Sequence, residues 1–444
     1  MAETLLPEDA SPLNLQKESD YMRRWQRIII ALMGVGYAGY YLCRSDLSVA
    51  TPYLIQAFGK QGLNKVAIGG ISSIGVLCYS AGKFVNGSLT DYLGGRKMFL
   101  AGMGGSVLFT MLFGLGNAIP FFTIAWALNR LIQSTGWVGM VRITSRWNSY
   151  STYGAVMGII SLIYFFGDFL SRIFLGFLAE QGVGWRGLFY ISGGVLCLIF
   201  LLNLFLMKES PAEIGEPEPP ANPANVFGEE PGEAGEKGLK SILFPLFRNP
   251  IFWVICLLSA GFTLVRETFN TWTPEYLVEA VKMAPGTAGL VSSSFPLFGG
   301  ISVMICGYAS DRLGNSGRAA IIFFGLLFST PALLALGFLP LHSSPGLAVF
   351  ALGIVALVLI GPYSFLAGAV SLDLGGKRGC ATACGWIDGI GYFGAIASGS
   401  GVGEIAQKLG WRAAFAFLAL VTALSCLASA YYWRNQLLIK RKTA

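Results

Sequence analysis

Apolar stretches about twenty residues long recur along the chain, separated by short polar connections. A helix of that length crosses the hydrocarbon core of a bilayer, so each stretch predicts one transmembrane span. The first six predicted spans cover roughly residues 27–54, 66–89, 98–116, 119–141, 153–180 and 187–207. The last six cover roughly residues 250–277, 288–310, 319–339, 345–370, 380–407 and 413–433. The pattern therefore predicts an all-α polytopic membrane protein with twelve transmembrane helices in two pseudo-symmetric halves.

A polar stretch separates the two sets of six spans. Residues 208–248 are rich in proline, glutamate and glycine, and this composition cannot bury a core, so we expect a disordered cytoplasmic linker. The expected organisation is an N-terminal tail 1–26, a six-helix bundle 27–207, the linker 208–248, a second six-helix bundle 249–434 and a tail 435–444.

The composition agrees with a membrane protein. Hydrophobic residues make up 54% of the chain and charged residues 12%, whereas a soluble domain carries about 25% charged residues. The net charge of +7 is explained by basic loops on the cytoplasmic side of the membrane, not by nucleic-acid binding. Arg96 and Lys377 are typical of these loops, and Lys60 and Lys282 are exceptions. We expect both termini in the cytoplasm, and the absence of a transit peptide favours a bacterial inner membrane.

Cysteine and histidine give no sign of metal or redox chemistry. Most of the eight cysteines lie in apolar stretches, where cysteine behaves as a small hydrophobe. The only histidine, His342, lies in a short predicted loop, away from any nucleophile. We therefore expect no metal, no cofactor and no enzymatic activity.

Two short motifs occur once in each half. GSLTDYLGGRK (87–97) follows the second span and a degenerate copy, GYASDRLG (307–314), follows the eighth. A Gly-Trp-Arg triplet opens both the sixth and the twelfth spans. Similar separations of the copies indicate a duplicated six-span unit, the parallel repeat of transporters. We expect Asp91, Arg96 and Asp311 of these loops to act in gating through a charge network between helix ends.

Arg44 lies deep in the otherwise apolar first span, where a charge costs at least ~2.5–3.5 kcal/mol. Tyr37 and Tyr41 precede it on the same helical face. Arg266 lies at the matching depth of the seventh span, because each arginine is ~25 Å along its helix. Two arginines repel each other unless an anion lies between them, and phosphate or carboxylate accepts paired hydrogen bonds from both. The two residues therefore predict an anion site between the halves.

The alternative is that each arginine pairs permanently with a nearby acid. Asp46 lies two residues after Arg44, and Glu267 directly follows Arg266. On a helix these spacings direct the side chains to different faces. We therefore expect neither acid to be a direct partner of its neighbouring arginine.

Five further charged residues lie in or beside the spans. Lys83 either supplies a third positive charge or extends toward the cytoplasmic end of its helix. Asp168 and Arg172 are four residues apart, so they form either a self-neutralised structural pair or a gate with a proton-linked acid. Asp388 is a lone acid expected to face a cavity, with coupling as a further role. Arg142 is expected to be structural or gating.

The loop motif G-x-L-x-D-x-L-G-x-R-K after the second span resembles that of the major facilitator superfamily. The resemblance covers the whole chain apart from the tail and the linker. It implies a twelve-helix fold in two halves that alternate access to a central site.

Longer matches resemble the organophosphate:phosphate antiporters, the glycerol-3-phosphate and hexose-phosphate transporters. The matching segments are Gly36 to Arg44, Arg266 with the later Trp272-Thr-Pro-Glu-Tyr-Leu, Lys83-Phe-x-x-Gly87, and Gln133-x-x-Gly136-Trp137 with Arg142 and Trp147. The resemblance implies that Arg44 and Arg266 bind phosphate, that Lys83 matches a lysine of the family, and that a sugar phosphate is exchanged for inorganic phosphate.

The chain also departs from this family. Tyr164 stands where glycerol-3-phosphate members have a histidine, Ser45 where many have a lysine, and Pro296 where an acid is found. The phosphate half of the site is retained, whereas the specificity for the organic group stays open. The segment Arg44–Pro52 also resembles the anion:cation symporters, which carry sugar acids with protons.

Three functions follow. The first is exchange of a phosphate ester (glycerol phosphate, phosphoglycerate or sugar phosphate) for inorganic phosphate. The alternatives are proton-coupled symport of sugar acids or other carboxylates, and a non-transporting sugar-phosphate sensor.

The expected substrate-binding residues are Arg44, Arg266, Lys83, Tyr37, Tyr41, Tyr164, Asn270 and Tyr392. The expected coupling or gating residues are Asp46, Asp168, Arg172, Asp388, Asp91, Arg96, Asp311 and Arg142. The expected partners are the anionic substrate, inorganic phosphate or protons, and the lipid bilayer, with the protein acting as a monomer.

Overall fold

The computed structural model describes residues 19–63, 65–220, 225–227, 239–283, 294–338 and 345–443. Within these ranges the regular secondary structure is helical, which confirms the predicted fold class. The first half contains α1 (Asp20–Phe58), α2 (Lys65–Leu93), α3 (Gly95–Leu115), α4 (Ile119–Gln133), α5 (Thr135–Trp147), α6 (Tyr153–Glu180) and α7 (Trp185–Leu206). Then follow α8 (Leu239–Arg248), α9 (Pro250–Glu279), α11 (Ser294–Phe338), α12 (Pro345–Phe365), α13 (Ser371–Leu409) and α14 (Trp411–Thr443).

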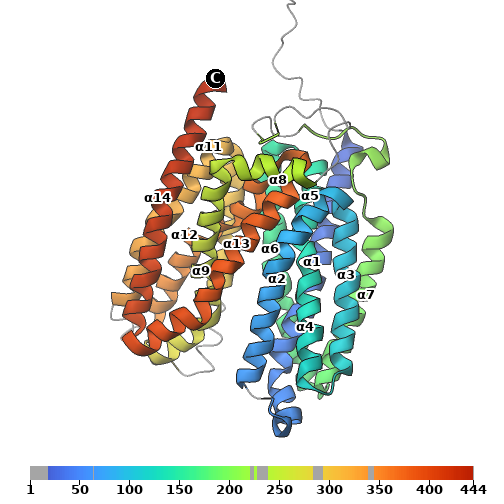
Figure 1. Cartoon of the computed structure of the whole chain (residues 1–444), viewed down its shortest axis with the longest axis vertical. Coiled ribbons are helices and arrows are strands. Elements are labelled where there is room, and N and C mark those ends of the chain that lie inside the picture. The colour runs from blue at the N-terminus through green and yellow to red at the C-terminus, as the bar shows by residue number, and fades with distance from the viewer. Residues whose placement is uncertain are drawn as a thin grey trace, which may run out of the picture.

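The helices divide into two side-by-side bundles (Figure 1), α1–α7 in one and α9–α14 in the other. The short helix α8 lies across one end of the molecule, at the same end as the C-terminus. We call this end, which also carries residues 208–220, the linker side, and the opposite end the far side.

Helix boundaries and predicted spans differ in the second half. Helix α11 covers the predicted eighth and ninth spans in one helical run of 45 residues. Its Gly299 lies against Ile360 of α12 and its Gly325 against Pro362 of α12. In a straight helix these two glycines would be ~39 Å apart. Helix α11 therefore reverses direction and contributes two limbs that pack on the same part of α12.

The predicted tenth and eleventh spans are also continuous. A π-helical turn, Leu366–Val370, connects α12 to α13, and Gly376 has φ 51° and ψ −152°. Glycine adopts this left-handed φ without a Cβ clash, so the chain reverses there between two spans. In the first half, α4 and α5 meet at Ser134 and together form the predicted fourth span.

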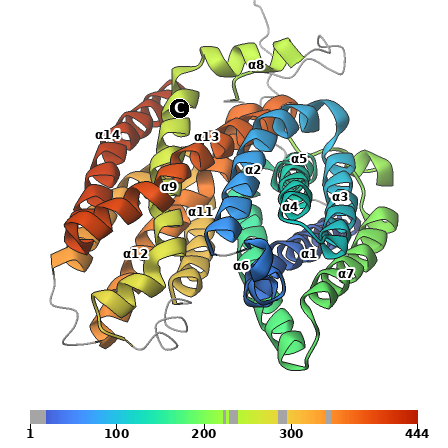
Figure 2. The ribbon, with the colours of Figure 1, turned by 60° about the horizontal axis from the view of Figure 1, so that its bottom comes forward.

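The two halves meet most closely where α2 lies beside α13 (Figure 1 and Figure 2). A Cβ atom on Gly385 of α13 would lie 2.3 Å from the backbone oxygen of Lys83. A Cβ on Gly87 of α2 would lie 2.8 Å from Cα of Gly385. These glycines are required because the two backbones touch, as is common where small residues line helix contacts in membranes. The halves are thus held in direct contact on the linker side.

Residues 208–220 differ from the expected disordered linker. Residues Pro211–Ile214 form a 3₁₀ turn, and α8 follows later in the segment. The Glu209 carboxylate accepts hydrogen bonds from the backbone N–H groups of Gly95 (2.9 Å) and Arg96 (2.7 Å), which caps the N-terminus of α3. This part of the linker is ordered because its carboxylates pair with helix ends and basic residues, which composition cannot reveal.

Candidate substrate-binding site

A cavity of about 510 Å³ lies between the two halves. Helices α1, α2, α5 and α6 form one wall, and α9, α12, α13 and the π-helical turn form the other. The lining is mostly aromatic and hydroxyl-bearing: Tyr37, Tyr41, Tyr79, Trp137, Ser161, Tyr164, Phe165, Arg266, Ile360, Tyr363, Ser364, Ala367, Asp388 and Tyr392.

Arg44 lies just behind the lining on the first wall. Its guanidinium carbon is 4.7 Å from the ring centre of Tyr41 and 4.9 Å from that of Tyr79. Its Nε donates to Gln133 Oε1 at 3.2 Å, while Nη2 is buried and has no hydrogen-bond partner among the described residues. A buried, unpaired charged donor is costly unless a ligand accepts its hydrogen bond. Arg44 is therefore oriented and still has a free donor.

Arg266 belongs to the lining on the second wall. Its guanidinium carbon lies 4.8 Å from the ring centre of Tyr363, and Nη2 donates to the Tyr392 hydroxyl at 3.2 Å. Its Nε is buried without a hydrogen-bond partner in the described structure. The ring of Tyr79, which contacts Arg44, and the ring of Tyr392, which contacts Arg266, have their centres 5.1 Å apart. The structure thus brings both predicted arginines to one aromatic cluster, from opposite halves.

The expectation for Glu267 is wrong. Arg266 Nη2 also donates to Glu267 Oε1, so the adjacent carboxylate forms an ion pair with the arginine. Successive residues on a helix point about 100° apart, but the long arginine side chain can fold back far enough to meet its neighbour. Asn270, a predicted binding residue, is exposed and donates to the same carboxylate at 3.4 Å instead of lining the cavity.

Asp388 is not a lone acid. It lines the cavity as expected, but Lys83 Nζ lies 2.7 Å from its Oδ2, and the Lys83 side chain is fully buried. Lys83 therefore neither extends to the linker side nor supplies an uncompensated third charge. The partners are 305 positions apart in the chain and belong to different halves, so spacing along one helix could not reveal the pair.

Sequence reasoning missed Arg130 and the role of Gln133. Arg130 of α4 is buried, and its guanidinium carbon lies 4.7 Å from the ring centre of Tyr79. Gln133 Oε1 accepts hydrogen bonds from both Arg44 and Arg130. Arg130 lies mid-way along the predicted fourth span, so the cost argument that singled out Arg44 would have found it. Among the described residues neither arginine has a carboxylate within ion-pair distance.

The other predicted acids form no ion pair with Arg44, Arg130 or Arg266 within the described residues. Asp46 is fully buried; its Oδ1 accepts from the backbone N–H of Leu47, and its Oδ2 has no hydrogen-bond partner in the described ranges. Asp168 accepts a hydrogen bond from the Ser45 hydroxyl at 2.8 Å. The side chain of Arg172, the expected partner of Asp168, lies outside the described residues.

Asp91 of the first loop motif contacts the second half on the linker side. The Asp91 carboxylate of α2 accepts hydrogen bonds from the backbone N–H groups of Ala381 (3.2 Å) and Thr382 (2.5 Å) of α13. Arg142 Nη1 lies 3.6 Å from Asp91. Arg96 instead donates to the Leu204 carbonyl. Asp91 therefore joins the halves, while the side chain of Asp311 and all of His342 lie outside the described part of the chain.

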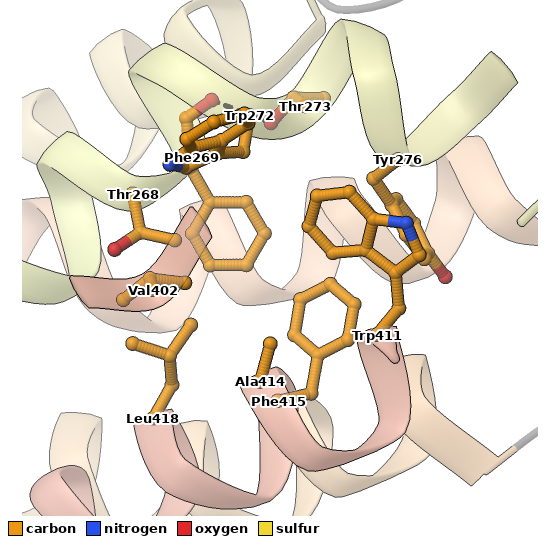
Figure 3. Close-up of a pocket in the computed structure, with 10 residues that line it drawn as sticks. All are labelled: Thr268, Phe269, Trp272, Thr273, Tyr276, Val402, Trp411, Ala414, Phe415 and Leu418. Carbon is orange, nitrogen blue, oxygen red and sulfur yellow. Dashed lines mark hydrogen bonds between the residues drawn. The ribbon is translucent and has the colours of Figure 1, made fainter. Parts of the chain in front are cut away.

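A second cavity of about 260 Å³ lies within the second half, between α9, α13 and α14 (Figure 3). Its lining is Thr268, Phe269, Trp272, Thr273, Tyr276, Val402, Trp411, Ala414, Phe415 and Leu418. The polar atoms of Trp272, Thr268 and Thr273 are used in hydrogen bonds to backbone carbonyls. With no charged group in its lining, this cavity does not suit an anion.

A helical membrane protein with two halves around a central polar cavity is built as a secondary transporter. The family model described as Major Facilitator Superfamily matches residues 33–284 and 255–444. The chain belongs to this family, which confirms the predicted twelve-span fold and a transporter rather than an enzyme. A structure of another family member, FucP in the outward conformation, covers 92% of this chain and 99% of its own, with TM-score 0.72 and 15% identity.

Three curated relatives cover nearly the whole chain. A probable hexose phosphate transport protein of Chlamydia muridarum is 28% identical and covers 95% of this chain and 93% of its own. The glycerol-3-phosphate transporter of Bacillus subtilis is 26% identical, with 94% of each chain covered. The membrane sensor protein UhpC of Escherichia coli is 24% identical, with 95% of each covered. These similarities confirm the resemblance to the organophosphate:phosphate antiporter family.

Proposed function

We propose that this protein carries a phosphate ester across the membrane in exchange for inorganic phosphate, by alternating access to the cavity between its halves. One observation carries the proposal. Arg44 and Arg266 approach the same aromatic cluster from opposite halves, and each has a buried donor atom without a partner in the described structure. An anion bound between them would supply the missing acceptors.

The charge around the cavity favours phosphate over a monocarboxylate. Lys83 is paired with Asp388 and Arg266 with Glu267, whereas Arg44 and Arg130 lack an acidic partner in the described ranges. Two positive charges without an ion-pair partner match a phosphate dianion, which also offers more acceptor oxygens than a carboxylate. The names of the hexose-phosphate and glycerol-3-phosphate relatives support the same substrate class.

The same positive charge of the empty site favours exchange of one anion for another. An empty site with buried, uncompensated guanidiniums resists the rearrangement that would expose it to the other side, because moving unpaired charge through a dry interior is costly. A bound anion removes this cost in both directions. We further propose that the protein is a monomer in a bacterial inner membrane, with the linker side facing the cytoplasm, as the basic loops favour.

The test is counterflow in proteoliposomes loaded with unlabelled phosphate. Labelled external phosphate should be taken up in exchange for the unlabelled internal phosphate, without a proton gradient. An external phosphate ester should compete with this uptake. Uptake that requires a proton gradient and ignores internal phosphate would instead support the carboxylate symporter, which needs an acid such as Asp46 or Asp168.

The sensor function is favoured by one observation, the 24% identity to UhpC over 95% of each chain. A sensor would bind a phosphate ester with the same two arginines but would not move it. Binding in detergent together with no counterflow in proteoliposomes would support the sensor and contradict transport.

A further inference from the structure

The two arginines of the cavity are not equivalent. Arg44 has no acidic partner in the described structure, whereas Arg266 already holds the Glu267 carboxylate through Nη2. Glu267 also accepts a hydrogen bond from Asn270, and a quarter of its side chain is exposed. The second wall therefore places a fixed negative charge beside the guanidinium that would bind substrate.

We propose that Glu267 determines specificity as a charge filter: it admits phosphate esters of uncharged polyols and disfavours substrates with a carboxylate beside the phosphate. This inference rests on the proposed function and adds the class of organic group. The family resemblance left that group open, because Tyr164 and Ser45 depart from the known pattern.

The hydrogen-bond geometry explains why a phosphate ester passes this filter. A carboxylate binds arginine best through two parallel bonds, and on the Nε edge these use Nε and Nη2. In Arg266, Nη2 is engaged with Glu267 and Tyr392, so the Nε edge cannot offer two free parallel bonds, and Nε is buried without a partner in the described chain. A phosphate oxygen can take the single bond from Nε while a second oxygen takes the bond from Arg44 Nη2. Glu267 then stays in place.

The other residues that line the cavity suit a substrate whose organic part is uncharged and carries hydroxyl groups. Hydroxyl groups of Ser161, Tyr164, Tyr363 and Ser364 line the cavity and can exchange hydrogen bonds with a polyol. The only acid in the cavity lining is Asp388. A second anionic group on the substrate, brought close to Arg266, would approach the Glu267 carboxylate that already neutralises this arginine, and Asp388 of the same wall is neutralised by Lys83. Like charges brought close together disfavour binding.

The experiment measures competition against labelled inorganic phosphate by the purified protein in nanodiscs. The competitors are glucose 6-phosphate, with an uncharged body, and 3-phosphoglycerate, with an added carboxylate. Wild-type protein should favour glucose 6-phosphate by at least about tenfold. Glu267→Gln should reduce this ratio by about tenfold, mainly through tighter binding of 3-phosphoglycerate. Glu279→Gln is the matched control on the same helix, where the carboxylate accepts from Trp411 outside the cavity, and it should keep the wild-type ratio.

Two results would overturn the filter while leaving the proposed function intact. One is a wild-type protein that binds glucose 6-phosphate and 3-phosphoglycerate about equally. This result needs no variant, so it does not depend on the folding of Glu267→Gln. The other is an unchanged ratio in a folded Glu267→Gln protein that still binds phosphate. Failure of wild-type protein to bind either phosphate or glucose 6-phosphate would reject the proposed function, and the filter with it.

Discussion

Lys83 of α2 and Asp388 of α13 form a buried ion pair across the two halves, with 2.7 Å between Nζ and Oδ2. Next to it the Ser80 hydroxyl donates to the Gly389 carbonyl at 3.0 Å, and closer to the linker side Asp91 binds the backbone of α13. Opening the linker side separates α2 from α13, so each of these contacts must break. The pair thus links the cavity to the contact between the halves, because Asp388 also lines the cavity.

Removing one member of this pair should open the linker side. Asp388→Asn leaves the Lys83 charge buried without a partner, and breaking such a pair costs about 3–5 kcal/mol. We expect a lower melting temperature and faster labelling of a cysteine introduced at the linker-side end of α13. The double variant Lys83→Met with Asp388→Asn should recover part of the loss, with a coupling energy of about 1–3 kcal/mol. If the stability loss of the double variant equals the sum of the losses of the two single variants, the pair does not hold the halves together.

Arg44→Ala and Arg266→Ala should each reduce phosphate counterflow by at least about a hundredfold, because each removes a charged hydrogen bond worth about 1.5–3 kcal/mol and a positive charge. Arg44→Lys should reduce counterflow to a similar extent. A lysine ammonium cannot both replace the Nε hydrogen bond to Gln133 and offer the substrate a second donor in the position of Nη2. Arg186→Ala is the control, because that arginine bonds Gly116 and Asn117 away from the cavity. Near-normal phosphate binding by both alanine variants would contradict the proposed site.

Gly385→Ala should push the halves apart on the linker side, because the new Cβ would meet the Lys83 backbone oxygen at 2.3 Å. Backbone cannot move aside as a flexible side chain can, so we expect destabilisation of about 1–3 kcal/mol for the closed arrangement. Gly194→Ala on α7 is the control, since no atom lies within 4 Å of its added Cβ. Thermal unfolding and linker-side cysteine labelling measure both effects, and equal behaviour of the two variants would contradict this packing argument.

Glu218 connects the halves through residues 208–220. Its carboxylate accepts from Arg146 Nε of α5 at 2.9 Å and from Lys377 Nζ of α13 at 2.9 Å. Partial burial alone would raise the pKa of Glu218, but the hydrogen bonds from Arg146 and Lys377 outweigh it and lower the pKa. A lowered folded-state pKa means that the stabilisation is complete above the unfolded pKa of about 4.3 and is lost as the pH falls through the folded value.

Glu218→Gln should therefore lower stability by about 0.5–1 kcal/mol at pH 7, the scale of a partly exposed ion-pair network. The difference from wild type should stay constant between pH 7 and pH 5 and shrink below about pH 4.3. Thermal unfolding across this pH range tests the prediction, with Glu404→Gln as the control, because Glu404 pairs only with exposed Lys408 among the described residues. A difference that grew as the pH fell would reverse the assigned sign.

Much of the fold was predictable because it depends on local properties. The length of an apolar stretch determines whether a helix can cross a bilayer, and duplicated motifs reveal the two halves. The cost of a charge in lipid is also local, so Arg44 and Arg266 stood out without any knowledge of their surroundings. The same argument applied to Arg130 would have added a third arginine.

Only the tertiary structure decided which charges are paired. The Lys83–Asp388 and Glu218–Lys377 pairs join residues far apart in sequence, and the ordered part of the linker depends on Glu209 meeting the start of α3. Such contacts are determined by the rotation and separation of packed helices, which a linear pattern does not contain. Even Glu267, adjacent to Arg266, was misjudged, because the direction of a long side chain is determined by the walls around it. The sequence by itself determined where the charges lie along each helix, and the packing of the two halves determined what each charge faces.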